Sequence, residues 1–186
     1  MVASSEGHVE CVRLLLEKAD VDRANNKGQQ TALMLASSNG HIECVRALLD
    51  KADVDRADKC GDTALMIASH HGHVECVRAL LDKADVDRTD KYGNTALMIA
   101  SQNGHVECVR LLLDKAEVNR ADKYRMTALM FASQHGHVDC VRALLEAGAT
   151  DDDGRAMILA SQKGNVALLK LLIQEFKPKD FAMAAL

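Results

Sequence analysis

Apolar and polar positions follow a pattern that recurs every 32 or 33 residues along the chain. In one such unit, helical spacing of apolar residues predicts a short helix over 95–102, with Thr95 as its N-cap. A second helix is predicted over 105–115, where apolar residues share one face and charged residues the other. The apolar face of this second helix consists of Val106, Cys108, Val109, Leu112 and Leu113.

The stretch 118–124 leads to the next copy, and it is too short and too polar to form a third helix. We expect it to project as a turn or hairpin. Neither predicted helix would hold its shape alone, because isolated helices shorter than about 12–15 residues are marginal in water. Burial must therefore come from the stacking of neighbouring units, which predicts an all-α solenoid.

Two motifs mark the copies and carry a family resemblance. Gly-His-x-Glu/Asp-Cys-Val-Arg begins at Gly7, Gly40, Gly72, Gly104 and Gly136, with a degenerate copy from Gly164. Thr-Ala-Leu-Met-x-Ala-Ser begins at Thr31, Thr63, Thr95 and Thr127, with a worn form from Arg155. Such runs resemble ankyrin repeats over nearly the whole chain. The resemblance implies an ankyrin-repeat solenoid of stacked antiparallel helix pairs joined by short hairpin loops.

The chain departs from the family pattern at two kinds of position. Ala96 and Met98 stand where ankyrin repeats usually have Pro and His, so the customary internal hydrogen bonds of that His are absent. The family's Gly after the second helix is kept only at Gly148, and we expect its loss elsewhere to shorten the elbow. The replacing residues are Lys18, Lys51, Lys83 and Lys115.

We interpret residues 1–186 as one ankyrin-repeat domain. Its divisions are a partial first repeat 1–24, repeats 25–57, 58–89, 90–121 and 122–149, a degenerate last repeat 150–177 and a tail or cap 178–186. Met1 aligns with Met34, so the first unit begins midway through a helix and is expected to fray. Residues 180–186 could fold back over the apolar last helix; alternatively, both ends are cuts within a longer array.

Composition and charge narrow the partner class. A formal net charge of -4 gives no electrostatic reason to expect nucleic acid or an anionic membrane. No apolar run approaches the roughly 20 residues that cross a bilayer, and the first six residues lack the features of a signal peptide. We therefore expect an intracellular, cytoplasmic, monomeric protein whose partner is another protein.

Cysteine and histidine recur in register with the repeat. Of the six Cys, all but Cys60 are expected to be reduced core thiols, because stacked helices lie about 8–10 Å apart and a disulfide needs Cα atoms closer than roughly 7 Å. A His precedes each recurring Cys by three residues. Two ligands per repeat do not make the four of a structural zinc site, so we expect a structural His and no metal or cofactor.

Catalytic signatures are missing from the sequence, which has no Gly-rich phosphate loop, no Gly-x-Ser-x-Gly and no His-Glu-x-x-His. A Cys-His pair repeated five times serves stacking, whereas an active site is normally a single constellation. We therefore expect a non-catalytic interaction module or scaffold. The alternative is a passive spacer, or a fragment of a longer ankyrin-containing protein whose activity lies in another domain.

The resemblance implies that a partner binds at the hairpin tips and along the concave face of the first helices. The candidate tip residues are Lys91, Tyr92, Asn94, Lys123, Tyr124, Arg125 and Met126. The candidate concave residues are His70, His71, Gln102, Asn103, Gln134 and His135. These residues differ between copies while the framework stays nearly constant, which fits adaptation to a ligand and fits drift at exposed positions equally well.

For four tip residues and one loop residue the expectations are more specific. Tyr92, Tyr124 and Met126 are expected to form an exposed apolar edge. Arg125 replaces the turn glycine that we assign to Gly28, Gly61 and Gly93, and a left-handed non-Gly residue costs about 1 kcal/mol. A decayed turn would explain Arg125 as well. Asn119 lies in a loop that resembles the site of asparagine hydroxylation in ankyrin repeats.

Overall fold

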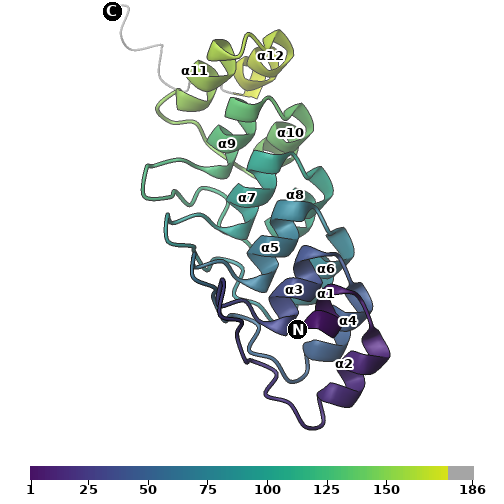
Figure 1. Ribbon diagram of the computed structural model, residues 1–186. Coiled ribbons are helices and arrows are strands. Elements are labelled where there is room, and N and C mark those ends of the chain that lie inside the picture. Colours follow the sequence, from purple (N-terminus) through teal and green to yellow (C-terminus); the bar gives the residue numbers. More distant parts are fainter. Residues whose placement is uncertain (176–186) are drawn as a thin grey trace, which may run out of the picture.

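The computed structural model describes residues 1–175 of the chain. Twelve helices in this range form six antiparallel pairs that stack into an elongated array (Figure 1). The helices are α1 (Val2–Ser5), α2 (Val9–Leu15), α3 (Ala32–Ser38), α4 (Ile42–Leu48), α5 (Ala64–His71), α6 (Val74–Leu80), α7 (Ala96–Asn103), α8 (Val106–Leu113), α9 (Ala128–His135), α10 (Val138–Glu146), α11 (Arg155–Gln162) and α12 (Val166–Glu175).

The odd-numbered helices pack against one another in an inner row, and the even-numbered helices form an outer row. The long loops between pairs all project from the same side of the array, next to the inner row (Figure 1). Within residues 1–175 the only β pairing is an isolated antiparallel bridge between Ala121 and Thr127. The predicted all-α solenoid is therefore confirmed, and the helix predicted over 105–115 is α8.

The core is built mainly from Ala, Leu, Val, Met and Cys, as the scarcity of aromatic residues requires. Each central inner helix buries its Ala-Leu-Met face almost completely, and each central outer helix buries one Cys, one Val and one Leu. In α7 and α8 the fully buried members include Leu97, Met98, Cys108 and Leu112. Helices of seven or eight residues are stable here because both neighbours in the row cover them.

The inner helices begin at a recurring threonine cap. In α7 the Thr95 hydroxyl oxygen accepts a hydrogen bond from the Met98 backbone N–H at 3.4 Å. In return, the Met98 sulfur accepts a weak bond from the Thr95 backbone N–H at 3.5 Å. The same pair of bonds joins Thr31 and Met34. The methionine that replaces the usual His therefore supplies a polarisable acceptor at the helix start.

Adjacent repeats are joined by a glycine and a histidine that meet across the repeat boundary. Nε2 of His105 donates to the carbonyl oxygen of His70 in the previous repeat at 2.9 Å. The His105 ring lies against Gly72, so closely that a Cβ added to Gly72 would be 2.5 Å from Nδ1. His41, His73 and His137 each make the equivalent bond. The expectation that the recurring histidines are structural is confirmed for these four, whereas His8 is exposed.

The elbows after the outer helices form a second set of bonds between repeats. Nζ of Lys83 donates to the Leu49 carbonyl at 3.0 Å, and Nζ of Lys115 donates to the Leu81 carbonyl at 2.9 Å. These carbonyls belong to the C-terminal ends of the preceding outer helices, where a cation also complements the helix dipole. Nζ of Lys51 donates to the Leu16 carbonyl in the same way, so three of the four lysines that replace the family's Gly satisfy carbonyl groups of the neighbouring repeat.

One part of the cysteine prediction is wrong. Cys44, Cys76, Cys108 and Cys140 are buried and free, but Cys11 is exposed. The reason is that α2 is the first outer helix, with an outer-row neighbour on one side alone. Burial raises the pKa of the Cys76, Cys108 and Cys140 thiols to about 11, which keeps them protonated and unreactive. The proposed cover at 180–186 lies outside the described residues.

The close approach of Gly72 and His105 predicts that Gly72→Ala strongly destabilises the protein. Gly72 has φ +71°, and its added methyl would collide with a ring that is held by the His70 carbonyl. We expect a loss of about 2 kcal/mol or more, measured by urea unfolding. Gly148→Ala is the control, because Gly148 has φ +88° with nothing within 4 Å of the added atom. It should cost only about 1 kcal/mol; equal losses would disprove the contact.

A column of buried serine hydroxyls predicts a substitution that stabilises the protein. The Oγ atoms of Ser37, Ser69, Ser101 and Ser133 are buried without a hydrogen-bond partner. Ser101→Ala should therefore stabilise the protein by about 1 kcal/mol, because an unsatisfied buried hydroxyl is removed. Ser161→Ala is the matched control at the equivalent, exposed position of α11, and it gains only helix propensity. Thermal unfolding of both variants tests this; an equal gain would contradict it.

Candidate functional site

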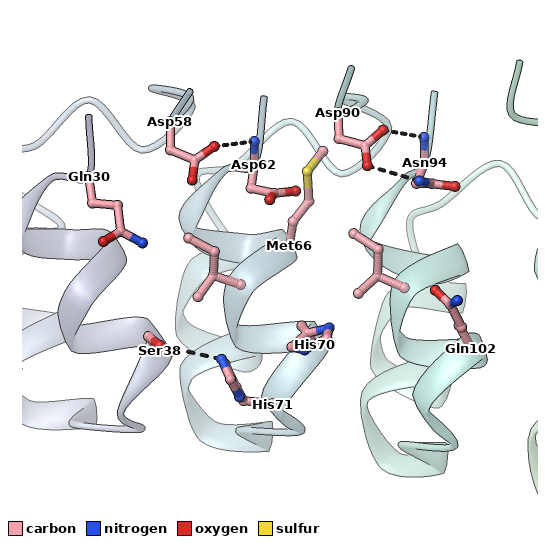
Figure 2. Close-up of a pocket in the computed structure, with 12 residues that line it drawn as sticks. Gln30, Ser38, Asp58, Asp62, Met66, His70, His71, Asp90, Asn94 and Gln102 are labelled. Carbon is pink, nitrogen blue, oxygen red and sulfur yellow. Dashed lines mark hydrogen bonds between the residues drawn. The ribbon is translucent and has the colours of Figure 1, made fainter. Parts of the chain in front are cut away.

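A depression of about 350 Å³ lies on the loop side of the inner row and spans three repeats (Figure 2). The second, third and fourth repeats supply its walls, and its lining combines carboxylates, imidazoles and amides with a small apolar part. The lining residues are Gln30, Ser38, Asp58, Asp62, Met66, Ile67, His70, His71, Asp90, Asn94, Ile99 and Gln102. We call this depression the concave groove.

Two aspartates organise the loops that wall the groove. Asp58 Oδ1 accepts from the backbone N–H groups of Cys60 at 2.7 Å and Asp62 at 3.0 Å. Asp90 Oδ1 accepts from the N–H groups of Tyr92 and Asn94, both at 2.8 Å. Each aspartate therefore fixes a hairpin tip from inside, in the manner of an Asx turn.

Asp62 and Asn94 occupy the same position in successive repeats but differ in their bonding. Asn94 Nδ2 donates to Asp90 Oδ2 at 2.9 Å, as Figure 2 shows. The Asp62 side chain is a carboxyl and has no N–H to donate to Asp58. Burial raises the pKa of the Asp62 carboxyl, the negative charges of Asp58 and Asp90 raise it further, and His70 opposes them. The groove therefore holds a carboxylate in surroundings that disfavour its charge.

Two imidazoles from the end of α5 complete the groove. The rings of His70 and His71 meet edge to face, with centroids 4.9 Å apart. His71 Nε2 is hydrogen-bonded to Ser38 Oγ at 3.3 Å (Figure 2). Burial lowers the pKa of His71, and His70, His73 and His105 lower it further by repulsion. The neutral His71 ring is thus available as both a donor and an acceptor.

The structure brings together part of the predicted concave set. His70, His71 and Gln102 line the groove, and Asn103 Nδ2 lies 3.3 Å from His70 Nδ1. Gln134 and His135 are at the end of α9, and neither lines the groove. Sequence reasoning missed Asp58 and Asp90 as groove residues. Their signal was an Asp at a fixed place in each hairpin, which identifies a turn but not what the turn faces.

The tips expose two tyrosines from adjacent repeats. Tyr92 is 57% exposed and Tyr124 is 67% exposed. The Lys123 backbone N–H donates to the Tyr92 carbonyl at 3.0 Å, which holds the two tips together. Met126 is not part of an exposed edge, contrary to expectation: it is partly buried against the core, and its sulfur lies 3.7 Å from Arg155 Nη2.

The left-handed conformation expected at Arg125 is confirmed, since its φ is +62°. The assignment of Gly28 to the same turn position is wrong. In the second repeat Gln29 holds the left-handed conformation with φ +58°, and Gly28 lies one residue earlier. Two of the four equivalent tips therefore have a non-Gly residue there, so Arg125 is not an exception that by itself calls for a functional explanation.

Asn119 bridges two repeats through its side chain. Its Oδ1 accepts from the Thr150 backbone N–H at 2.9 Å, and its Nδ2 donates to the Gly148 carbonyl at 3.2 Å. Asp22, Asp55 and Asp87 accept from the next repeat in the same way. In this structure the amide is therefore part of the bonding between repeats.

One loop in the described range gathers possible metal ligands. Within residues 1–175 one group, Asp58, Cys60 and Asp62, places three possible ligand atoms within 4.8 Å of one another. Asp58 Oδ1 already accepts two backbone hydrogen bonds, and exposed acidic groups of this kind are common in loops. None of the helices in the same range is long and apolar enough to cross a bilayer.

Comparison with known proteins agrees with this architecture. The family model for ankyrin repeats, which describes three copies, matches residues 1–58, 52–122 and 116–182. The chain therefore belongs to the ankyrin-repeat family. The ankyrin repeat domain of human ASB11, solved by crystallography, is similar with a TM-score of 0.84 and 27% identity, over 94% of this chain and 81% of that one. No curated protein matches the chain.

The contrast between Asp62 and Asn94 predicts that Asp62→Asn stabilises the protein at pH 7. The amide removes a disfavoured charge and can donate to Asp58 as Asn94 does to Asp90, so we expect a gain of about 1 kcal/mol. The folded state raises the Asp62 pKa, so the charge penalty is present at neutral pH and is lost as pH falls through that pKa toward 3.8.

Thermal unfolding at pH 7 and at pH 4 measures the effect. Asp152→Asn, in an exposed loop of the last repeat, is the control and should change little. A loss of stability in Asp62→Asn at pH 7, or a gain that grows on acidification, would contradict the repulsion.

Proposed function

We propose that this protein is a non-catalytic interaction module that binds another protein through the concave groove and the hairpin tips. Ankyrin repeats generally mediate binding to other proteins, and neither the family match nor the structural relative indicates a catalytic family. A scaffold role in which the protein acts as a cytoplasmic monomer fits this proposal. The formal charge of -4 gives no reason to add nucleic acid or an anionic membrane as a partner.

The observation that carries the proposal is the groove itself. The repeats that line it share a frame: a Thr-capped inner helix, a tip fixed by Asp58 or Asp90 or, in the second repeat, by Asn25, and the His contact to the previous repeat. Its lining differs between copies, with His71 where other repeats have Asn39 and Asn103, and Asp62 where the next has Asn94. The different polar groups that converge in this depression can fix the orientation of a bound partner segment and so give specificity.

Affinity capture tests the proposal with the intact protein as bait in an extract of its own cells. The variant is His70→Ala/Gln102→Ala, which shortens two exposed groove residues. The control is Glu75→Ala/Glu107→Ala, on the outer helices of the same two repeats. We expect a protein that is retained by the wild type and the control and at least tenfold less by the groove variant. Retention of nothing specific would favour the spacer.

A further inference from the structure

The central repeats expose only two large hydrophobic side chains, Tyr92 and Tyr124. In the described residues, the other exposed members of this class all lie in the first or the last helix pair, where a row of helices ends. These are Met1, Val2, Leu14, Leu15, Ile158, Val166 and Ile173. Those seven side chains are exposed because their helices lie at an end of a row and lack a neighbour on one side. The tyrosines, in contrast, lie on loops between repeats that are covered on both sides. Their exposure needs a different explanation.

The two tyrosines are held at a fixed spacing before any partner arrives. The Tyr92 N–H is bonded to Asp90 Oδ1 and the Tyr124 N–H to Asp122 Oδ1, both at 2.8 Å. The Lys123 N–H to Tyr92 carbonyl bond then joins one tip to the next. Tyrosine has few rotatable bonds, so an ordered pair loses little entropy on binding.

Positive charge surrounds the pair. Lys91, Lys123 and Arg125 are exposed, and none of them forms an ion pair with any carboxylate of residues 1–175. The nearby carboxylates do not neutralise these cations, because Asp90 and the buried Asp122 accept backbone hydrogen bonds inside their own loops. The outward face of the two tips therefore combines an aromatic pair with unneutralised cations.

The surface formed by the tyrosines and their neighbouring cations does not continue onto the loops on either side. Asp152 and Asp153, in the loop before α11, line a shallow depression together with Arg125. Negative charge therefore begins at the loop that follows the Tyr124 tip. On the other side, Gly28 and Cys60 stand at the tip position of the tyrosines in the second and third repeats. The combination of aromatic and cationic groups is confined to the tips of the fourth and fifth repeats.

We propose that Tyr92, Tyr124, Lys91, Lys123 and Arg125 bind an extended acidic segment of a partner protein. The inference rests on the proposed function and names the chemistry of one part of the partner. Adjacent repeats are spaced by about 10 Å, and an extended chain of the polyproline type returns to the same face every three residues, or about 9 Å. Carboxylates three residues apart can therefore pair with successive tips while the tyrosines pack on the backbone between them.

The probe is a phage-displayed library of random dodecapeptides selected on the full chain. We expect the enriched peptides to carry more Asp and Glu than Lys and Arg. One enriched peptide, labelled with fluorescein, then gives affinities by fluorescence anisotropy. Tyr92→Ala/Tyr124→Ala should weaken binding at least tenfold with an unchanged unfolding midpoint, because the tips contribute little to the core. Lys91→Glu/Lys123→Glu should weaken binding by a similar factor, and added salt should weaken wild-type binding.

Lys27→Glu is the matched control, because Lys27 has the same loop position two tips away and should leave the affinity unchanged. Enriched peptides without an acidic surplus, or an affinity that the tyrosine variant leaves intact, would overturn the inference. A single-stranded 12-nucleotide DNA that displaces the peptide at lower concentration would also overturn it, in favour of nucleic acid. If His70→Ala/Gln102→Ala abolishes peptide binding while the tip variants do not, this inference fails but the proposed function stands. No enrichment at all would overturn this inference, and the affinity capture then decides the proposed function by itself.

Discussion

Contact between neighbouring repeats is the interaction on which the rest of this structure depends. The central helices have seven to nine residues, and helices of this length are stable only when both neighbours cover them. Three kinds of contact meet this constraint. Apolar faces pack between helices, the His105 ring lies against Gly72, and elbow lysines donate to carbonyls of the previous repeat. Polar bonds and apolar contacts therefore cross the same boundary, and each fixes the register of the other.

The repeat period and the helix pairs could be predicted because stacking leaves a regular trace in the sequence. The predicted boundaries of α8 were within two residues of those observed, since its apolar face has a clear helical period. The burial of Cys11, in the first helix pair, was predicted wrongly, because repeats with the same motif do not have the same neighbours. The turn position was misassigned at Gly28, because glycine was taken as the marker of a left-handed residue and Gln29 holds that conformation instead.

The candidate site was less accessible to sequence reasoning than the frame. Tyr92 and Tyr124 could be placed on neighbouring tips because they are one repeat apart. The exposure of Met126 was predicted wrongly, because it packs against the core and its sulfur contacts Arg155, the first residue of α11 in the next repeat. Asp58 and Asp90 were not recognised as groove residues, since a carboxylate that fixes a turn and one that faces a depression look alike in sequence. A contact between repeats that occurs once, such as that of Met126 with Arg155, leaves no periodic signal in the sequence.

The aspartates inside the hairpin tips have a consequence for how such a protein can change over time. Asp58, Asp90 and Asp122 fix the path of each loop through backbone N–H groups, which every residue except proline offers. The side chains at the tip, Cys60, Tyr92 and Tyr124, take no part in these bonds. Mutations there can replace one recognition chemistry with another while the loop keeps its shape. New specificities can therefore arise in single steps without passing through unstable intermediates.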